Sequence, residues 1–339
     1  MSPDKFYLTI KQLPDQCVQA FEEAGRREIP ASHSEVQSVV VCGMGGSALG
    51  PEIIGDVFGS QLPVPYIVNR EYSLPFQANG TTLVMLSSYS GNTEEVLSCG
   101  REALEKKAKL LAITTGGKLA DFAKENEIPC YQIEPIHNLS GQPRMGLGYS
   151  VFGVLGLLVN IQLIRYSVTQ LSSLTEYLQT SFTKVEKRAT ELAKKLEGRL
   201  PILIGAEHLK GAVHVFDNLL NESAKTFTSC FYLPELDHDL LEGLAFPRDA
   251  RETLTFFFAD SNLYLPRMRE RVGLSREIIE QQNYSVVGIK PRAAGRLTQA
   301  MEVVALGMLT SYYLAKQYGV DPSSAEIVEE FKRKLTKHA

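Results

Sequence analysis

The stretch Ser88-Tyr-Ser-Gly-Asn-Thr93 has the composition of an anion-binding loop. The apolar residues 81–86 before it favour a buried strand, and the residues from Glu94 onward have the spacing of an amphipathic helix. At such a strand-to-helix turn, unpaired backbone N–H groups and the helix dipole attract an anion, and hydroxyls can bind its oxygens. Because the loop contains no lysine, it suits a compact phosphomonoester better than the Walker-type cradle of a nucleotide. Alternatively, its Ser and Thr residues only cap the helix.

A glycine-rich loop, residues 43–48 (Gly-Met-Gly-Gly-Ser-Ala), follows a strand predicted over residues 37–42. Its glycine spacing satisfies the relaxed dinucleotide fingerprint, so an NADP-dependent dehydrogenase is one candidate. That fingerprint also needs an acidic residue at the end of the next strand, where it binds the ribose hydroxyls. Here the next strand, residues 65–68, is followed by Asn69 and Arg70, and an arginine suits NADP. This loop alone therefore leaves the dehydrogenase open.

Taken together, the two loops resemble those of the sugar isomerase (SIS) family. The octapeptide S-Y-S-G-N-T-E-E, residues 88–95, is similar to the phosphate loop of that family. We call its first six residues, 88–93, the phosphate loop. V-C-G-M-G-G-S-A-L-G, residues 41–50, is similar to the first glycine loop of one branch, the bifunctional phosphoglucose/phosphomannose isomerases. A second anion-binding loop has no use in a dinucleotide enzyme, and it favours the isomerase. The resemblance assigns substrate and phosphate binding to Gly45, Gly46, Ser47, Ser88, Ser90 and Thr93, although Ser47 could only cap its helix.

The same resemblance implies an arginine and a carboxylate in the active site. The segment Q-P-R-M-G-L-G resembles the one that brings the family's arginine into the site, here Arg144. An arginine there would stabilise negative charge developing on an enediolate oxygen. Glu222, in N-E-S-A-K at the end of a predicted helix, matches the family's catalytic base. Without the family, Arg144 reads as a surface arginine and Glu222 as a solvated helix carboxylate paired with Lys225.

A histidine and a terminal lysine complete the implied catalytic set. His238 matches the family's histidine, but Asp237 and Asp239 flank it where the family has asparagine, and their charge could raise its pKa. The pattern I-x-x-x-F-K-x-x-L resembles the family's final helix, whose lysine points into the site. Lys332 is the best match and Lys334 the alternative. Both could instead be cations that stabilise a helix C-terminus.

Short apolar strands alternate with helices along the chain, which is typical of an α/β protein whose parallel sheets are covered on both faces. Because both halves have this pattern, we expect two tandem SIS-like doubly wound domains with terminal helices, residues 1–170 and 171–339, joined by a hinge at residues 167–173. We expect helices at residues 6–27, 48–58, 148–166, 174–196, 210–220, 266–281, 296–318 and 325–335, and strands of the second half at residues 200–204, 254–258 and 284–289.

The composition is that of an ordinary globular protein, with a net charge of −4 and 44% hydrophobic residues. No basic excess is present to bind a polyanion, so a nucleic-acid partner is not expected. The most apolar stretch, residues 151–164, is too short to span a membrane, and the sequence does not open on a recognisable signal. Five scattered cysteines fit free thiols in the cytoplasm. His208 and His214 lie off the helical spacing of a metal site, so no metal is expected. The isomerase interpretation needs no cofactor, and none is expected.

The resemblance implies an enzyme, an aldose–ketose isomerase that interconverts glucose 6-phosphate, mannose 6-phosphate or both with fructose 6-phosphate through a cis-enediol. The resemblance implies a homodimer in which the histidine enters the active site from the partner subunit. It also associates tolerance of both C2 epimers with a threonine near the last helix, where this chain has Ser323 and Ser324. The preferred epimer stays open. A non-catalytic phosphosugar-binding SIS protein is the alternative, since a sensor would need the phosphate loop without Arg144, Glu222 and His238.

Overall fold

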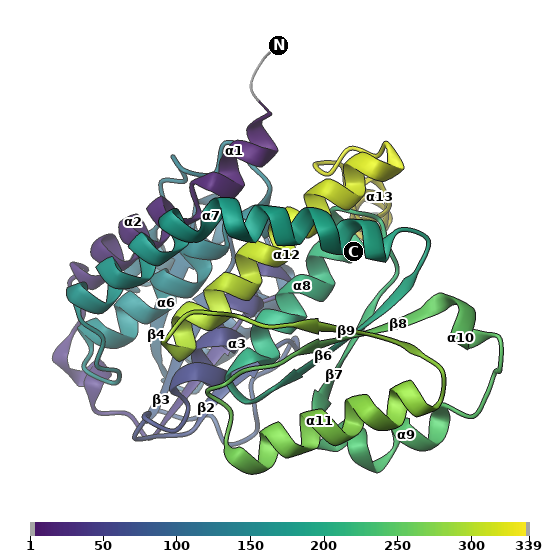
Figure 1. Cartoon of the computed structure of the whole chain (residues 1–339). Coiled ribbons are helices and arrows are strands. Elements are labelled where there is room, and N and C mark those ends of the chain that lie inside the picture. The colour runs from purple at the N-terminus through teal and green to yellow at the C-terminus, as the bar shows by residue number, and fades with distance from the viewer. Residues whose placement is uncertain (1–3, 337–339) are drawn as a thin grey trace.

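The computed structural model describes residues 4–336 and contains two parallel β-sheets with helices between and around them (Figure 1). The first sheet has the strand order β2-β1-β3-β4-β5 and the second the order β7-β6-β8-β9. The chain is therefore an α/β protein, as its sequence predicts. The strands of the first sheet are β1 (Ser38–Cys42), β2 (Tyr66–Asn69), β3 (Thr82–Ser87), β4 (Lys109–Thr114) and β5 (Cys130–Gln132). Those of the second are β6 (Leu200–Ala206), β7 (Ser229–Leu233), β8 (Leu254–Ala259) and β9 (Ser285–Ile289).

The strand order of each sheet reverses next to its first strand, between β1 and β3 and between β6 and β8. Ligands of open α/β sheets bind outside the carboxyl ends of the strands at such switch points. In the first sheet the register places Cys42 of β1 beside Leu86 of β3, so the loops that follow these strands start side by side. The glycine loop and the phosphate loop therefore share the ligand-binding end of this sheet.

Long helices fill the space between the two sheets (Figure 1). The helices α3 and α6 pack on the first sheet and α8 on the second, while α3 crosses both α6 and α8. Helix α12 packs on α8 and α7. Their apolar side chains form one continuous core that reaches both sheets. The bounds of these helices, with those of α2 beside α6, are α2 (Leu13–Gly25), α3 (Gly46–Phe58), α6 (Leu147–Asn160), α7 (Val168–Leu196), α8 (Lys210–Glu222) and α12 (Arg296–Tyr318).

The first sheet is buried on both faces. Val39 and Val41 of β1 face the main core, whereas Val40 and Cys42 face a smaller apolar cluster under α4 and α5. This alternation follows from the two-residue period of a strand and explains why the strands read as continuous apolar runs. The remaining helices are α1 (Lys5–Lys11), α4 (Glu94–Glu105), α5 (Gly117–Glu125), α9 (Leu240–Gly243), α10 (Ala250–Thr253), α11 (Pro266–Gln281) and α13 (Glu326–Thr336).

Several predicted boundaries are wrong. The first helix is broken at Gln12, where α1 ends and α2 begins with Pro14 in its first turn. The apolar helix α6 ends at Asn160, six residues before the predicted end at position 166. Residues 168–173 of the predicted hinge are helical, because Ser167 and Gln170 form a capping box that starts α7 early. The boundary between residues 170 and 171 falls within this helix, and the division into two domains stays a prediction.

Candidate active site

The phosphate loop leaves β3 through a turn that only glycine allows. Gly91 has a φ of +69°, and a Cβ there would lie 1.8 Å from the carbonyl oxygen of Gly116. The buried Ser88 hydroxyl lies 2.7 Å from that of Thr93. Thr93 precedes α4 but its side chain makes no capping bond, so the interpretation of the loop as a simple helix cap is wrong. The hydroxyl of Ser90 is exposed and accepts a bond from the Asn92 N–H at 3.3 Å.

The glycine loop is hydrogen-bonded to the phosphate loop. The Ser47 hydroxyl accepts the backbone N–H of Tyr89 at 2.9 Å. The Ser87 hydroxyl donates to the Ser47 carbonyl, also at 2.9 Å. Ser47 lies inside α3, whose N-cap is Gly45 with a φ of +48°, so the alternative of Ser47 as a helix cap is wrong. The two loops thus form one unit at the carboxyl end of the first sheet.

Arg144 packs directly against this unit. It lies in a short 3₁₀ turn, Pro143–Met145, and a Cβ on Gly46 would lie 3.4 Å from its Cα. On the other side of the turn, a Cβ on Gly146 would lie 2.6 Å from the Tyr89 ring. Small residues at both positions let the arginine segment and the two loops approach closely. The side chain of Arg144 is only 6% exposed, so its interpretation as a surface arginine is wrong.

Glu222 reaches Arg144 from the second half of the chain. It is the last residue of α8, and its carboxylate lies 3.5 Å from the Arg144 guanidinium. The Arg144 Nε also donates to the Ser223 hydroxyl at 3.1 Å. Burial lowers the pKa of Arg144, while the negative charges of Glu222 and Asp321 oppose that shift. Glu222 is not paired with Lys225 through its carboxylate, because the Lys225 ammonium donates to the Glu222 carbonyl instead.

Arg144 also binds the segment that leads into the last helix, α13. Its terminal nitrogen donates to the carbonyls of Pro322 at 2.7 Å and Ser323 at 3.0 Å. The residues proposed to tolerate both epimers, Ser323 and Ser324, are thereby brought beside the Arg144–Glu222 pair. Gln142 is a further hydrogen-bond partner of Arg144, since its side-chain oxygen accepts a hydrogen bond from the guanidinium at 3.1 Å.

His238 lies away from this group within the same chain. It ends a 3₁₀ turn, Glu235–His238, that follows the carboxyl end of β7, whereas Glu222 precedes the amino end of that strand. Figure 1 shows α9, which directly follows this turn, on the opposite side of the second sheet from α13. The carboxylates on either side of His238 both have partners. Asp237 forms an ion pair with Arg271 at 2.7 Å, and Asp239 accepts a hydrogen bond from the Leu240 N–H.

The terminal lysines both lie on the exposed surface of α13. Lys332 lies two to three helical turns beyond residues 322–324, the segment held by Arg144, so the start of its helix is next to the site. Lys334 forms an ion pair with Glu330 at 2.6 Å along the same helix. The choice between these lysines as the one that enters the site stays a prediction.

The two histidines considered as metal ligands each contact another side chain. His208 is buried, its Nε2 lies 3.1 Å from the Gln299 side-chain oxygen, and burial lowers its pKa to about 4. His214 pairs with Glu52 at 2.8 Å. Within residues 4–336 no cluster of three or more His, Cys, Asp or Glu side chains is arranged to hold a metal ion. Over the same range, no helix has the length and apolarity needed to span a membrane.

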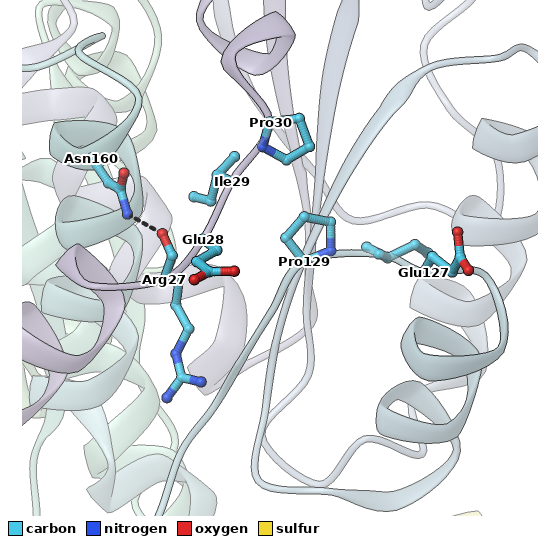
Figure 2. A pocket seen from close by; sticks show the side chains of 8 residues that line it. Arg27, Glu28, Ile29, Pro30, Glu127, Pro129 and Asn160 are labelled. Carbon is cyan, nitrogen blue, oxygen red and sulfur yellow. Dashed lines mark hydrogen bonds between the residues drawn. The ribbon is translucent and has the colours of Figure 1, made fainter.

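A surface hollow elsewhere on the molecule contains none of the predicted site residues. Figure 2 shows it between residues 27–30, residues 127–129 and Asn160, whose side chain donates to the Arg27 carbonyl. These segments precede β1 and β5, so the hollow lies at the amino ends of the strands. Ligands of open α/β sheets bind at the opposite ends. The candidate site is therefore the group formed by the two loops, Arg144 and Glu222.

Known sugar-phosphate isomerases are similar to this chain in sequence. Residues 185–335 match the family described as the bacterial phospho-glucose isomerase C-terminal SIS domain. A bifunctional phosphoglucose/phosphomannose isomerase from Caldicellulosiruptor bescii is 31% identical over 96% of this chain and 98% of its own. The chain belongs to the bifunctional phosphoglucose/phosphomannose isomerase family. Another member, from Aquifex aeolicus, is 29% identical over 89% of this chain and 92% of its own.

A solved structure shares the fold of this family member. That solved structure is a hypothetical protein from Thermus thermophilus. It has a TM-score of 0.76 and 16% identity to this chain, and the match covers 99% of this chain and 91% of the solved one. Because that identity is low, the likeness shows the fold alone.

The sequence did not predict which residues hold Arg144 in this phosphoglucose/phosphomannose isomerase family member, although Ser323 and Ser324 were named for another role. Ser223 and the carbonyls of residues 322–324 lie 79 to 180 positions away along the chain, and no local pattern links them to the arginine. Gln142 is the exception, since it stands two residues before Arg144 in the segment that carries the resemblance.

Proposed function

We propose that this chain interconverts glucose 6-phosphate, mannose 6-phosphate or both with fructose 6-phosphate. The observation that carries the proposal is the contact of Arg144 with Glu222 beside the two hydroxyl-bearing loops. A protein that only senses a phosphosugar needs the phosphate loop but no such pair next to it. Relatives named bifunctional phosphoglucose/phosphomannose isomerase support the same reaction.

The phosphate of the substrate binds at the phosphate loop and the start of α4. Ser88, Ser90 and Thr93 supply hydroxyls there, and Ser47 adds one from the glycine loop. The helix dipole and the first N–H groups of α4 complement the negative charge. The sugar then extends towards Arg144, because the glycine loop packs against that residue.

Glu222 transfers the proton in the open-chain sugar. Its carboxylate removes the proton from C2 of the aldose, giving a cis-enediol, and returns it to C1 of the ketose. Its side chain is 33% exposed, so it remains accessible to a substrate while touching Arg144. Arg144 stabilises the enediolate mainly through its charge, because its N–H groups already bind protein oxygens. Lys332 adds a second positive charge from α13.

The histidine is supplied by a second copy of the chain. Ring opening requires a proton transfer at the ring oxygen, which suits an imidazole. Glu222 precedes the amino end of β7 and His238 follows its carboxyl end, and this separation supports a homodimer in which each site takes His238 from the partner.

Turnover of each sugar phosphate measured separately tests the proposal. Formation of fructose 6-phosphate from glucose 6-phosphate and from mannose 6-phosphate is followed in a coupled assay with the wild-type chain. The carbonyls of Ser323 and Ser324 bind Arg144 beside the catalytic pair, and serine is smaller than the threonine that the family resemblance associates with tolerance of both epimers, so we expect turnover of both. Tight binding of the phosphosugars without turnover would instead identify a sensor, and stabilisation by NADP would identify a dehydrogenase.

A further inference from the structure

Helix α8 ends in a turn that holds a lysine in an unusual backbone conformation. Lys225 has a φ of +55°, and the N–H of the following Thr226 returns to the Leu220 carbonyl at 3.0 Å. Left-handed conformations just past a helix are normally occupied by glycine, since a Cβ is disfavoured there. A strained backbone conformation three residues after Glu222 indicates that the lysine side chain makes contacts that offset the strain.

The side chain of Lys225 joins two parts of the active site. Its ammonium donates to the carbonyl of Glu222 and to the carbonyl of Ser324, each at 2.5 Å. The first contact lies within the same turn, but the second spans 99 residues and reaches the segment before α13. A compact ammonium with several donors is well suited to bridge two carbonyl oxygens.

Arg144 binds the same segment, so two cations converge on the carbonyls of residues 322–324. Burial, followed by the positive charge of Arg144, lowers the pKa of Lys225, while Asp321 and Glu222 oppose this shift. These two carboxylates supply the negative charge that keeps both cations together. The entry to α13, and with it Lys332, is thus attached to the end of α8 that carries Glu222.

We propose that Lys225 is a positioning residue for the isomerase reaction, whose ammonium clasps residues 322–324 to the Glu222 end of α8. The clasp fixes Ser323 and Ser324 beside the substrate and holds α13 over the site. The inference rests on the proposed function, because its effect on catalysis requires that the chain be an isomerase. It explains why a lysine stands where glycine would be less strained.

A matched pair of glycine variants separates the effect of the Lys225 ammonium contacts from the effect of backbone strain. Lys107 has the same left-handed conformation just past α4, with a φ of +56°, and among residues 4–336 its exposed ammonium makes no hydrogen bond or ion pair. Lys107→Gly and Lys225→Gly therefore relax the same backbone strain, but only the second removes a clasp. Both variants are expected to fold, since glycine suits both turns.

The variants are compared by kinetics and by amide hydrogen exchange of residues 320–336. Lys107→Gly should match the wild type in both. Lys225→Gly should lower kcat/KM by about 10- to 100-fold, the usual effect of a misplaced site element, and speed exchange in the segment. Lys225→Arg, which keeps the charge and the donors, should restore part of the activity.

The outcomes distinguish this inference from the proposed function. Equal exchange at residues 320–336 in the two glycine variants would overturn the clasp, whatever the activity. Equal kcat/KM in the two variants would overturn its role in positioning. A wild-type chain without isomerase activity, but with the exchange difference present, would overturn the proposed function and the catalytic role while leaving the clasp itself in place.

Discussion

The guanidinium of Arg144 lies 3.5 Å from the carboxylate of Glu222, although 78 residues separate them in the sequence. The arginine is 6% exposed and the glutamate 33%, so the cation is fixed and the carboxylate remains accessible. A buried guanidinium requires compensating acceptors, which here are Ser223, Gln142 and backbone carbonyls near α13. Glu222 is therefore placed by a rigid partner, as a positioned base requires.

Replacing Glu222 by glutamine should slow turnover strongly without abolishing binding. The substitution keeps the size and hydrogen-bonding capacity of the side chain but removes the base, so the rate should fall by roughly 10²–10⁴ or more. The wild type should also wash solvent deuterium into C2, since the proton rests on an exchangeable carboxyl group. Glu176→Gln, on the exposed face of α7, is the control and should behave as the wild type. Near-normal turnover by the folded Glu222→Gln variant would contradict the assignment.

Removing the Ser90 hydroxyl should weaken phosphosugar binding and leave folding unchanged. The side chain is exposed and accepts only a long bond from Asn92, so few internal contacts are lost. A hydrogen bond to a charged group contributes about 1.5–3 kcal/mol, so affinity should fall by about 10- to 100-fold. Calorimetry with fructose 6-phosphate measures the effect for Ser90→Ala, with Ser173→Ala in α7 as the exposed control. Unchanged affinity would show that this loop does not hold the phosphate.

A methyl group at Gly91 should displace the phosphate loop. Its Cβ would meet the Gly116 carbonyl at 1.8 Å, in addition to the strain of a φ of +69°. Gly198 has a φ of +68° and nothing near its Cβ position, so Gly198→Ala measures the backbone strain alone, about 1–2 kcal/mol. Urea unfolding should show a larger loss for Gly91→Ala, and this variant alone should lose phosphosugar binding. Equal losses of stability with binding retained would mean that the loop accommodates the methyl group.

The sequence predicts site residues best where they belong to a short continuous segment of the chain. The phosphate and glycine loops were found because each joins an apolar strand to a helix within about a dozen residues, which is a short-range signal. The edge strand β7 was missed, because its residues Ser229–Leu233 are mostly half-buried and lack a clear apolar period. The contacts of Arg144 with the carbonyls of residues 322–324 were missed for a different reason, since contacts across 178 to 180 residues are set by packing alone.

Stability in acid should depend on His208. Burial lowers the pKa of His208 to about 4 from 6.5, so between these values the unfolded chain binds the extra proton. The free energy of unfolding should therefore fall as the pH falls through this window, by about 3 kcal/mol in all. Asp56 acts in the opposite direction, because burial raises its pKa from 3.8 to about 6 and the folded chain takes up that proton first. Urea unfolding of the wild type and of His208→Gln over this range isolates the histidine, and parallel curves would contradict the prediction.

Mixing two inactive variants should restore activity if each site combines Glu222 of one subunit with His238 of the other. In a heterodimer of Glu222→Gln and His238→Ala chains, one site carries both substitutions and the other carries neither. An equal mixture that exchanges subunits should therefore reach about a quarter of wild-type activity, because half of the dimers are mixed and one of their two sites is intact. Native mass spectrometry verifies that mixed dimers form. Mixed dimers without recovered turnover, or a monomer with full activity, would show that Glu222 and His238 act within one chain, which the placement of β7 between them in the second sheet disfavours.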